Sequence, residues 1–229
     1  TLLLKSPIPF RRAPLVQGTK LPGWLRVGRV DLNSLMYDHH QSVVLEIPQG
    51  LDLSLNHGLE YPYVTSRDCT VMAGMSDAGI HPSFLGQVCT VVRTFPIRVG
   101  AAYNEQGELL GESGPCYPDS RELSWAGDFP GVEPEVTTVT KRVRRIFTWS
   151  DLQYIHNLNI NRPSIVFLNF CNYLPDAAAF DALIKRMRKA EDFVFRAYHP
   201  RLVFGFGPNV EDVTANVNQA VAWYDRRGF

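Results

Sequence analysis

The spacing of apolar residues along the chain predicts strands that alternate with helices. Short apolar runs bounded by Pro or Gly indicate buried strands at residues 42–47, 94–99, 164–168 and 202–206. Apolar residues at helical spacing indicate helices at residues 80–93, 150–156, 176–189 and 211–224. This alternation is typical of an α/β fold, and we expect an open, largely parallel sheet with flanking helices.

The helix at residues 176–189 has the clearest pattern. Its apolar stripe consists of Phe180, Leu183, Ile184 and Met187, with basic residues around the rest of the surface. Two other segments have turn-forming compositions: we expect an irregular arm at residues 1–24 and a long surface excursion at residues 100–135. We expect the whole chain, residues 1–229, to form one domain.

The charge balance limits the classes of partner. The 23 basic residues equal the 23 acidic ones, so no global field attracts nucleic acid or an anionic membrane. No apolar stretch approaches the ~20 residues that a membrane-spanning helix needs. We therefore expect a cytoplasmic protein with no nucleic-acid or membrane partner, in which any anion site is built locally.

Neither the cysteines nor the histidines are spaced as metal ligands. The four cysteines are scattered, which favours reduced thiols over a disulfide framework. His39, His40 and His57 lack a third ligand at metal spacing, so we expect no metal site in this chain.

Four loops have the composition of ligand sites. Gln49 directly follows a predicted strand, and hydroxyls with one arginine gather at residues 61–70, although Gln is common in loops and the second segment also suits an ordinary turn. Residues 205–209 form a glycine loop between a strand and a helix, which on its own is weak evidence. In an α/β sheet, ligands bind in the loops at the carboxyl ends of strands.

The most distinctive loop is Thr137–Arg145, which we call the arginine loop. It carries three threonines and four basic residues in an otherwise neutral chain. Guanidinium groups bind carboxylates or phosphates through two parallel hydrogen bonds, so the loop predicts an anion site. The alternative is a solvated basic strand edge that discourages aggregation.

Taken in order, these motifs resemble the adenylosuccinate synthetase family, whose members join aspartate to the 6-position of a purine nucleotide. The resemblance runs over roughly residues 40 to 215. It rests on the motifs Val44–Gly50, His57-Gly58, Tyr61–Ser66, Arg98–Gly100, the arginine loop and Gly207-Pro208.

The resemblance implies three groups of ligand-binding residues. The purine monophosphate pocket would be lined by Gln49, Leu53, Thr65 and Val99. The aspartate carboxylates would be held by Thr138, Thr140, Arg142 and Arg144, in a register uncertain by one or two residues. The base of the triphosphate would lie beside Asn169, Asn172, Gly207 and Pro208. We expect the arginine loop to face Gln49 across a shared cleft.

One departure from the family pattern bears on the triphosphate. Guanine-specific members carry a Thr-Lys-x-Asp motif after a strand, where this chain has Asn169-Phe170-Cys171-Asn172. An amide can donate to an adenine ring nitrogen, which a carboxylate cannot do. We therefore expect ATP or dATP as co-substrate. With this uncharged motif, the sequence resembles the phage branch of the family, the 2-aminoadenylosuccinate synthetases that act on dGMP.

A second departure is that the family's phosphate loop, catalytic acid/base and catalytic histidine are not found in this sequence. We expect catalytic residues to lie in a missing N-terminal part. The resemblance implies Mg²⁺ with the triphosphate, a homodimer, and the host cytoplasm if a phage encodes the chain. IMP as substrate and a non-catalytic nucleotide-binding module remain alternatives.

Overall fold

The computed structural model describes residues 43–138, 140–196 and 198–226, and these fall into two compact units. Residues 43–57 and Thr65–Gly86 belong to the first unit; Gly58–Val64 and the residues from Gln87 onward belong to the second. The irregular arm expected at residues 1–24 and the pair His39-His40 lie outside the described residues. The expectation of a single domain stays a prediction.

The first unit is built around α2 (Val71–Ala78), with 3-10 turns at η1 (Leu51–Leu53) and η2 (Pro82–Phe84). The Thr70 side chain caps α2, and Gly79, at φ 67°, ends it. Ile47 packs its side chain against the helix at Gly74, where a Cβ would overlap it.

The strand predicted at residues 42–47 is wrong for the described part of that segment. Residues 43–47 form no ladder, and Val44 is 70% exposed. The Ile47 side chain packs on α2 rather than into a sheet.

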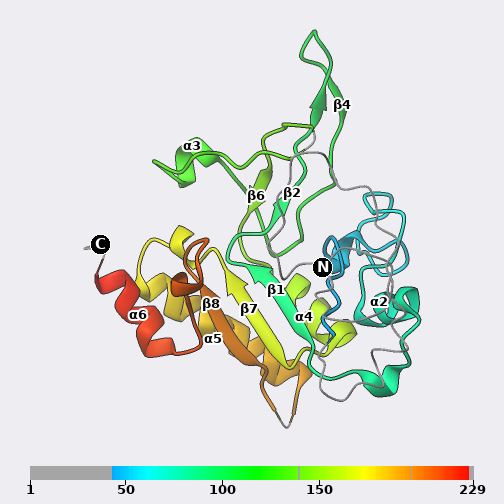
Figure 1. The fold of residues 1–229 in the computed structure, drawn as a ribbon. Coiled ribbons are helices and arrows are strands. Elements are labelled where there is room, and N and C mark those ends of the chain that lie inside the picture. Colours follow the sequence, from blue (N-terminus) through cyan, green and yellow to red (C-terminus); the bar gives the residue numbers. More distant parts are fainter. Residues whose placement is uncertain (1–42, 139, 197, 227–229) are drawn as a thin grey trace, which may run out of the picture. The chain divides into compact units, whose positions relative to one another are not determined.

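The second unit contains a four-stranded sheet in the order β1-β7-β8-β9. Its strands are β1 (Cys89–Arg93), β7 (Ile165–Asn169), β8 (Arg201–Gly205) and β9 (Val213–Thr214). The first three are parallel, and β9 pairs antiparallel with β8. Figure 1 shows this sheet with α5 alongside it. The predicted α/β class with a largely parallel sheet is confirmed.

The longer helices of this unit are α4 (Asp151–Asn161), α5 (Ala177–Val194) and α6 (Val217–Asp225). Each begins at a residue whose side chain accepts backbone N–H groups of the first turn, namely Ser150, Asp176 and Asn216. The predicted stripe of α5 is buried at Phe180, Leu183 and Met187. These side chains pack with Leu168 and other inward residues of the sheet in one apolar core.

Two smaller antiparallel sheets also belong to this unit. One joins β2 (Ile97–Arg98), β6 (Arg145–Phe147) and β5 (Glu122–Leu123), and the other pairs β3 (Ala102–Tyr103) with β4 (Leu109–Gly111). The short helix α3 (Trp125–Asp128) buries Trp125 against Phe129 and Ile146. Residues 100–135 are therefore more than a surface excursion, because they supply a second, aromatic core.

Two predicted helices are wrong in whole or in part. Residues 80–93 contain only the turn η2 and then β1, because the run Thr90-Val91-Val92 pairs in parallel with β7. Residues 211–224 contain η4 (Val210–Asp212) and β9 before α6 begins. Both segments have apolar residues at helical spacing, but β-branched residues also suit a sheet.

The four cysteines are free thiols, and burial raises the pKa of the Cys171 thiol to about 12. Among the helices of the described ranges, none combines the length and apolar character needed to cross a membrane.

A buried carboxylate ties α5 to α4 and to the segment before β8. Glu191 is fully buried and accepts hydrogen bonds from the Tyr154 hydroxyl at 2.8 Å and from Arg188 Nη1 at 2.6 Å. His199 Nδ1 lies 3.2 Å from the same carboxylate. Burial, followed by the charge of Glu191, raises the pKa of Tyr154, so this hydroxyl keeps its proton and donates.

We expect Glu191→Ala to lower the free energy of unfolding by about 3 kcal/mol, because the buried hydroxyl and the guanidinium lose their shared acceptor. Urea denaturation of both proteins measures the difference. The matched control is Asp192→Ala, since this neighbouring carboxylate is 69% exposed and should contribute less than about 0.5 kcal/mol. Equal effects of the two substitutions would contradict the role given to Glu191.

Candidate functional site

Three adjacent parallel strands end in one row at the carboxyl edge of the main sheet. Arg93 is the register partner of Asn169, and Leu168 pairs with Phe204, so Asn169 lies beside Gly205. We call Arg93, Asn169 and Gly205 the edge row. This edge is where open α/β sheets bind ligands, because the loops that leave the strands diverge there.

The turn after β7, Asn169–Tyr173, is held in one conformation, and we call it the base turn. Asn169 Oδ1 accepts the backbone N–H of Phe170 at 2.8 Å, and the Thr94 hydroxyl donates to the Phe170 carbonyl oxygen at 2.7 Å. Phe170 is left-handed at φ 61°, and the Arg93 guanidinium lies 3.5 Å from the centre of its ring. A left-handed conformation is unusual for an aromatic residue and is maintained here by contacts from β1.

The loop after β8 contains the expected Gly207-Pro208 pair. A Cβ at Gly207 would lie 2.5 Å from Asp212 Oδ2, so the glycine permits this close approach. The same carboxylate accepts the backbone N–H of Asn209 at 3.0 Å, which fixes the loop. Pro208 is exposed at its tip.

Asn172 completes the residues expected around the triphosphate base. It is partly buried, and its amide has no hydrogen-bond partner within the part of the chain that the structure describes. The structure brings Asn169, Asn172 and the Gly207-Pro208 loop to the carboxyl ends of two neighbouring strands, β7 and β8.

The arginine loop is closed by Thr137, which is buried. Its hydroxyl lies 2.6 Å from the Thr140 hydroxyl and accepts the backbone N–H of Arg142 at 3.0 Å. A bridge between Val136 and Val143 closes the base of the loop. Thr138 is exposed on the same loop.

The three arginines of this loop have different surroundings. Arg145 forms two hydrogen bonds to Glu122, at 2.8 and 2.6 Å, and a third to the Gly114 carbonyl oxygen at 2.7 Å. Its hydrogen bonds to Glu122 raise the pKa of the Arg145 guanidinium further. Arg142 is exposed and Arg144 is half-buried, and neither guanidinium has a partner among the described residues. Arg145 is thus structural, and Arg142 and Arg144 are available to a ligand.

Glu135 joins the arginine loop to the edge row. Its carboxylate accepts the Tyr173 hydroxyl at 3.1 Å and forms an ion pair with Arg93. Its carbonyl oxygen accepts the backbone N–H of Arg144 at 2.7 Å. Burial, then the charge of Glu135, raises the pKa of Tyr173 to about 12, which keeps its hydroxyl a donor.

Sequence analysis missed both Arg93 and Glu135. Arg93 was placed in a helix, and Glu135 was placed in a surface excursion. The available signal was the run of β-branched residues before Arg93, which fits a strand whose last residue would lie at a ligand-binding edge.

Val99 lies close to the arginine loop. A Cβ at the next residue, Gly100, would overlap the Val143 carbonyl oxygen, so the two segments touch there. Val99 itself is exposed, and its carbonyl oxygen accepts the Ser113 hydroxyl at 2.7 Å.

The other predicted monophosphate residues lie in the first unit. The Thr65 backbone N–H donates to the Leu53 carbonyl oxygen at 2.7 Å, so these two residues are neighbours. Gln49 is exposed, and its backbone is in the left-handed region at φ 69°. This conformation is uncommon for a residue other than glycine. That Gln49 faces the arginine loop across a shared cleft stays a prediction.

The described residues bring together no group of three or more His, Cys, Asp or Glu side chains that fits a metal ion.

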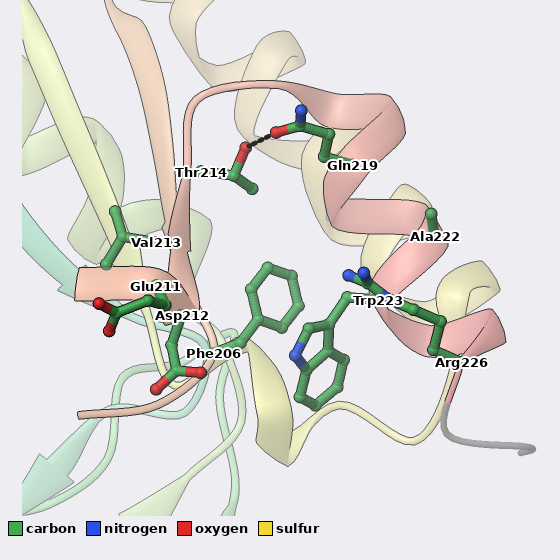
Figure 2. A pocket seen from close by; sticks show the side chains of 9 residues that line it. All are labelled: Phe206, Glu211, Asp212, Val213, Thr214, Gln219, Ala222, Trp223 and Arg226. Carbon is green, nitrogen blue, oxygen red and sulfur yellow. Dashed lines mark hydrogen bonds between the residues drawn. The ribbon is translucent and has the colours of Figure 1, made fainter. Parts of the chain in front are cut away.

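A separate hollow of about 280 Å³ lies between β9 and α6 (Figure 2). Phe206 and Trp223 stack in it with ring centres 4.5 Å apart, and the Thr214 hydroxyl donates to Gln219 at 2.7 Å. None of the residues expected to bind ligand lines this hollow. We therefore leave it out of the candidate site.

Similarity to known proteins identifies the family of the chain. The chain is 45% identical over 183 residues to the N6-succino-2-amino-2'-deoxyadenylate synthase of Salmonella phage PMBT28, with 79% of this chain and 48% of the relative covered. It is 31% identical over 182 residues to the adenylosuccinate synthetase of Thermococcus sibiricus, with 77% of this chain and 49% of the relative covered.

Among solved structures, the succinoaminodeoxyadenylate synthetase of cyanophage S-2L, bound to dGMP and dATP, matches with a TM-score of 0.64. The sequences are 38% identical, and the match covers 78% of this chain and 48% of that chain. The chain thus spans about half the length of the relatives it matches.

The family model described as adenylosuccinate synthetase matches residues 26–176. This segment contains all of the motifs that carry the resemblance except Gly207-Pro208, and it also contains the base turn. The chain belongs to the adenylosuccinate synthetase family.

Proposed function

We propose that this chain binds L-aspartate and nucleotides as part of a carbon–nitrogen ligase of purine biosynthesis. The reaction joins aspartate to the 6-position of (d)GMP and forms 2-amino-(deoxy)adenylosuccinate, with ATP or dATP as energy donor. The observation that carries this proposal is the arginine loop, whose Arg142 and Arg144 have no partner among the described residues and whose stem is tied to the edge row through Glu135.

The arginine loop has the chemistry that aspartate requires. Aspartate carries two carboxylates, and each is best held by a guanidinium that donates two parallel hydrogen bonds. Arg142 and Arg144 provide two such groups, and Thr138 and Thr140 add hydroxyls. Holding both carboxylates leaves the amino group directed at the purine, and this orientation is worth several kcal/mol of the barrier.

The purine monophosphate is proposed to bind at Gln49, Leu53, Thr65 and Val99. The choice of dGMP is supported by the phage relatives, since the cyanophage S-2L enzyme is described as bound to dGMP and dATP. IMP, the alternative substrate, is favoured by the weaker match to the archaeal adenylosuccinate synthetase.

The energy donor is proposed to place its base against Asn169, Asn172, Gly207 and Pro208. In this reaction the 6-oxygen of the purine receives a phosphoryl group, and the aspartate nitrogen then displaces that phosphate from C6. Mg²⁺ would neutralise charge on the triphosphate. We assign no phosphoryl-transfer role to the residues of this chain, because its sequence contains no phosphate loop.

The phage origin of several relatives favours action in the host cytoplasm. A homodimer is proposed from the family resemblance alone. A non-catalytic nucleotide-binding module is the rival function.

The function is tested first by ligand protection. We expect dGMP and L-aspartate each to raise the melting temperature of the chain, whereas D-aspartate and L-asparagine should not, because they misplace or remove one carboxylate. Adding a separately expressed segment of the Salmonella phage relative, covering its unmatched half, should then give turnover with dATP. Protection without turnover supports the binding module, and no protection by either ligand contradicts both functions.

Substitution tests the two unpartnered arginines. Arg142→Ala and Arg144→Ala should each weaken aspartate binding about 10- to 100-fold, because each removes a charge-assisted pair. Arg121→Ala is the matched control, since this exposed arginine has only a 3.9 Å contact to Asp128. Titration calorimetry measures the affinities, and unchanged aspartate binding in both variants would contradict the assignment.

The closure of the arginine loop is tested at Thr137. Thr137→Val keeps the shape of the side chain but removes the acceptor of the Arg142 N–H, so we expect about tenfold weaker aspartate binding and a loss of about 1 kcal/mol in stability. Thr214→Val removes a comparable hydroxyl from β9 and should leave aspartate affinity unchanged. If the two variants bind aspartate equally well, the loop does not depend on Thr137.

A further inference from the structure

The polarity of the Asn169 amide is fixed by its own turn. The Oδ1 atom accepts the Phe170 backbone N–H at 2.8 Å. If the amide were rotated, its Nδ2 group would face the Phe170 N–H, and two donors cannot form a hydrogen bond. The Nδ2 group is therefore directed away from the turn. It has no hydrogen-bond partner among the described residues.

Gly205 gives the amide the space to adopt this orientation. A Cβ on Gly205 would lie 2.6 Å from Asn169 Oδ1 and 3.0 Å from the ring of Phe167. Any larger residue at this position would displace the amide, since Gly205 is buried at the end of β8.

The turn is also held from β1. The Thr94 N–H donates to the Asn169 carbonyl oxygen at 3.1 Å, and the Thr94 hydroxyl donates to the Phe170 carbonyl oxygen at 2.7 Å. Thr94 is buried, and Arg93 stacks on the Phe170 ring. Rotation of the amide would break its bond to Phe170 in a segment that cannot readily shift to compensate.

Asn169 Oδ1 is engaged by the turn and lies next to Gly205, so the group that Asn169 presents to a ligand is its Nδ2 donor. Adenine has an acceptor at N1, where guanine has an N–H donor. A fixed donor directed at position 1 of the base therefore pairs with adenine and opposes guanine. The Asn172 amide is not fixed in this way, because it has no hydrogen-bond partner among the described residues. It can present either its oxygen or its nitrogen to a ligand. A freely rotating amide discriminates weakly between the two bases.

We propose that Asn169 is the residue that selects an adenine over a guanine nucleotide as energy donor, through its fixed Nδ2 donor. The inference rests on the proposed function, which places the triphosphate base at this turn. In the guanine-specific motif, the aspartate lies at the position of Asn172. The inference instead assigns the choice between adenine and guanine to Asn169.

The test compares Asn169→Asp with Asn172→Asp. An aspartate at position 169 keeps one oxygen to accept the Phe170 N–H but replaces the Nδ2 donor with an acceptor. We expect the preference for dATP over dGTP to fall by about tenfold or more in Asn169→Asp and to change by less than about threefold in Asn172→Asp. Dissociation constants for dATP and dGTP are measured by ligand-observed NMR, with Mg²⁺ and with dGMP at saturation to fill the monophosphate pocket.

A second variant tests the inference independently, in case Asn169→Asp does not fold. Gly205→Ala leaves Asn169 in place but displaces its amide, so it should weaken dATP binding while aspartate affinity stays unchanged. Thermal unfolding of each variant reports whether the fold is intact.

The possible results distinguish a failure of the inference from a failure of the proposed function. If Asn172→Asp changes the preference and Asn169→Asp does not, or if Gly205→Ala binds dATP as the unaltered chain does, the inference is overturned and the proposed function stands. If the unaltered chain binds neither triphosphate at millimolar concentration, both the inference and the proposed base site fail.

Discussion

Parallel pairing of β1, β7 and β8 is the constraint on which the candidate site depends. In a parallel sheet the register sets which residues leave the carboxyl edge together, and here it places Arg93, Asn169 and Gly205 in one row. These three residues supply a cation, an amide and a position without a side chain. The segments that follow them carry the base turn and the Gly207-Pro208 loop, so the register brings together the residues that are proposed to bind the base.

Glu135 connects that row to the arginine loop. A carboxylate with little exposure needs partners, and this one has Arg93 and the Tyr173 hydroxyl. Its backbone carbonyl accepts the Arg144 N–H, so the arginine that is proposed to bind aspartate and the turn that is proposed to bind adenine share one anchor. Arg145, by contrast, uses its guanidinium within the protein.

The elements that were predicted correctly are those for which local and long-range preferences agree. For α5, the apolar stripe and the Asp176 cap both indicate a helix, and for β7 and β8 the short apolar runs fit strands buried in a parallel sheet. The Ser150 cap was also correct, although α4 extends to Asn161. The helix predicted at residues 80–93 was wrong, because Val91 and Val92 fit helical spacing while their pairing with β7 depends on residues far along the chain.

Only part of the candidate site could be predicted from the sequence. Motifs indicated the arginine loop, Arg142, Arg144 and Asn169, but the register of the loop was uncertain by one or two residues. The position of Glu122 across β5 and β6 identifies Arg145 as the arginine that is used within the protein. Arg93 and Glu135 were missed because their function depends on pairing with each other, 42 residues apart. The fixed polarity of Asn169 depends equally on Gly205, which the sequence places on another strand.

The central claim is that one edge of the sheet holds two neighbouring subsites with different ligands. Backbone amide chemical-shift mapping of the isotope-labelled chain tests it most directly, with L-aspartate and dATP added separately. The account predicts that aspartate perturbs residues 137–144 and that dATP perturbs residues 169–173 and 205–209. Perturbations confined to α4, α5 and α6, or the same residues responding to both ligands, would contradict it.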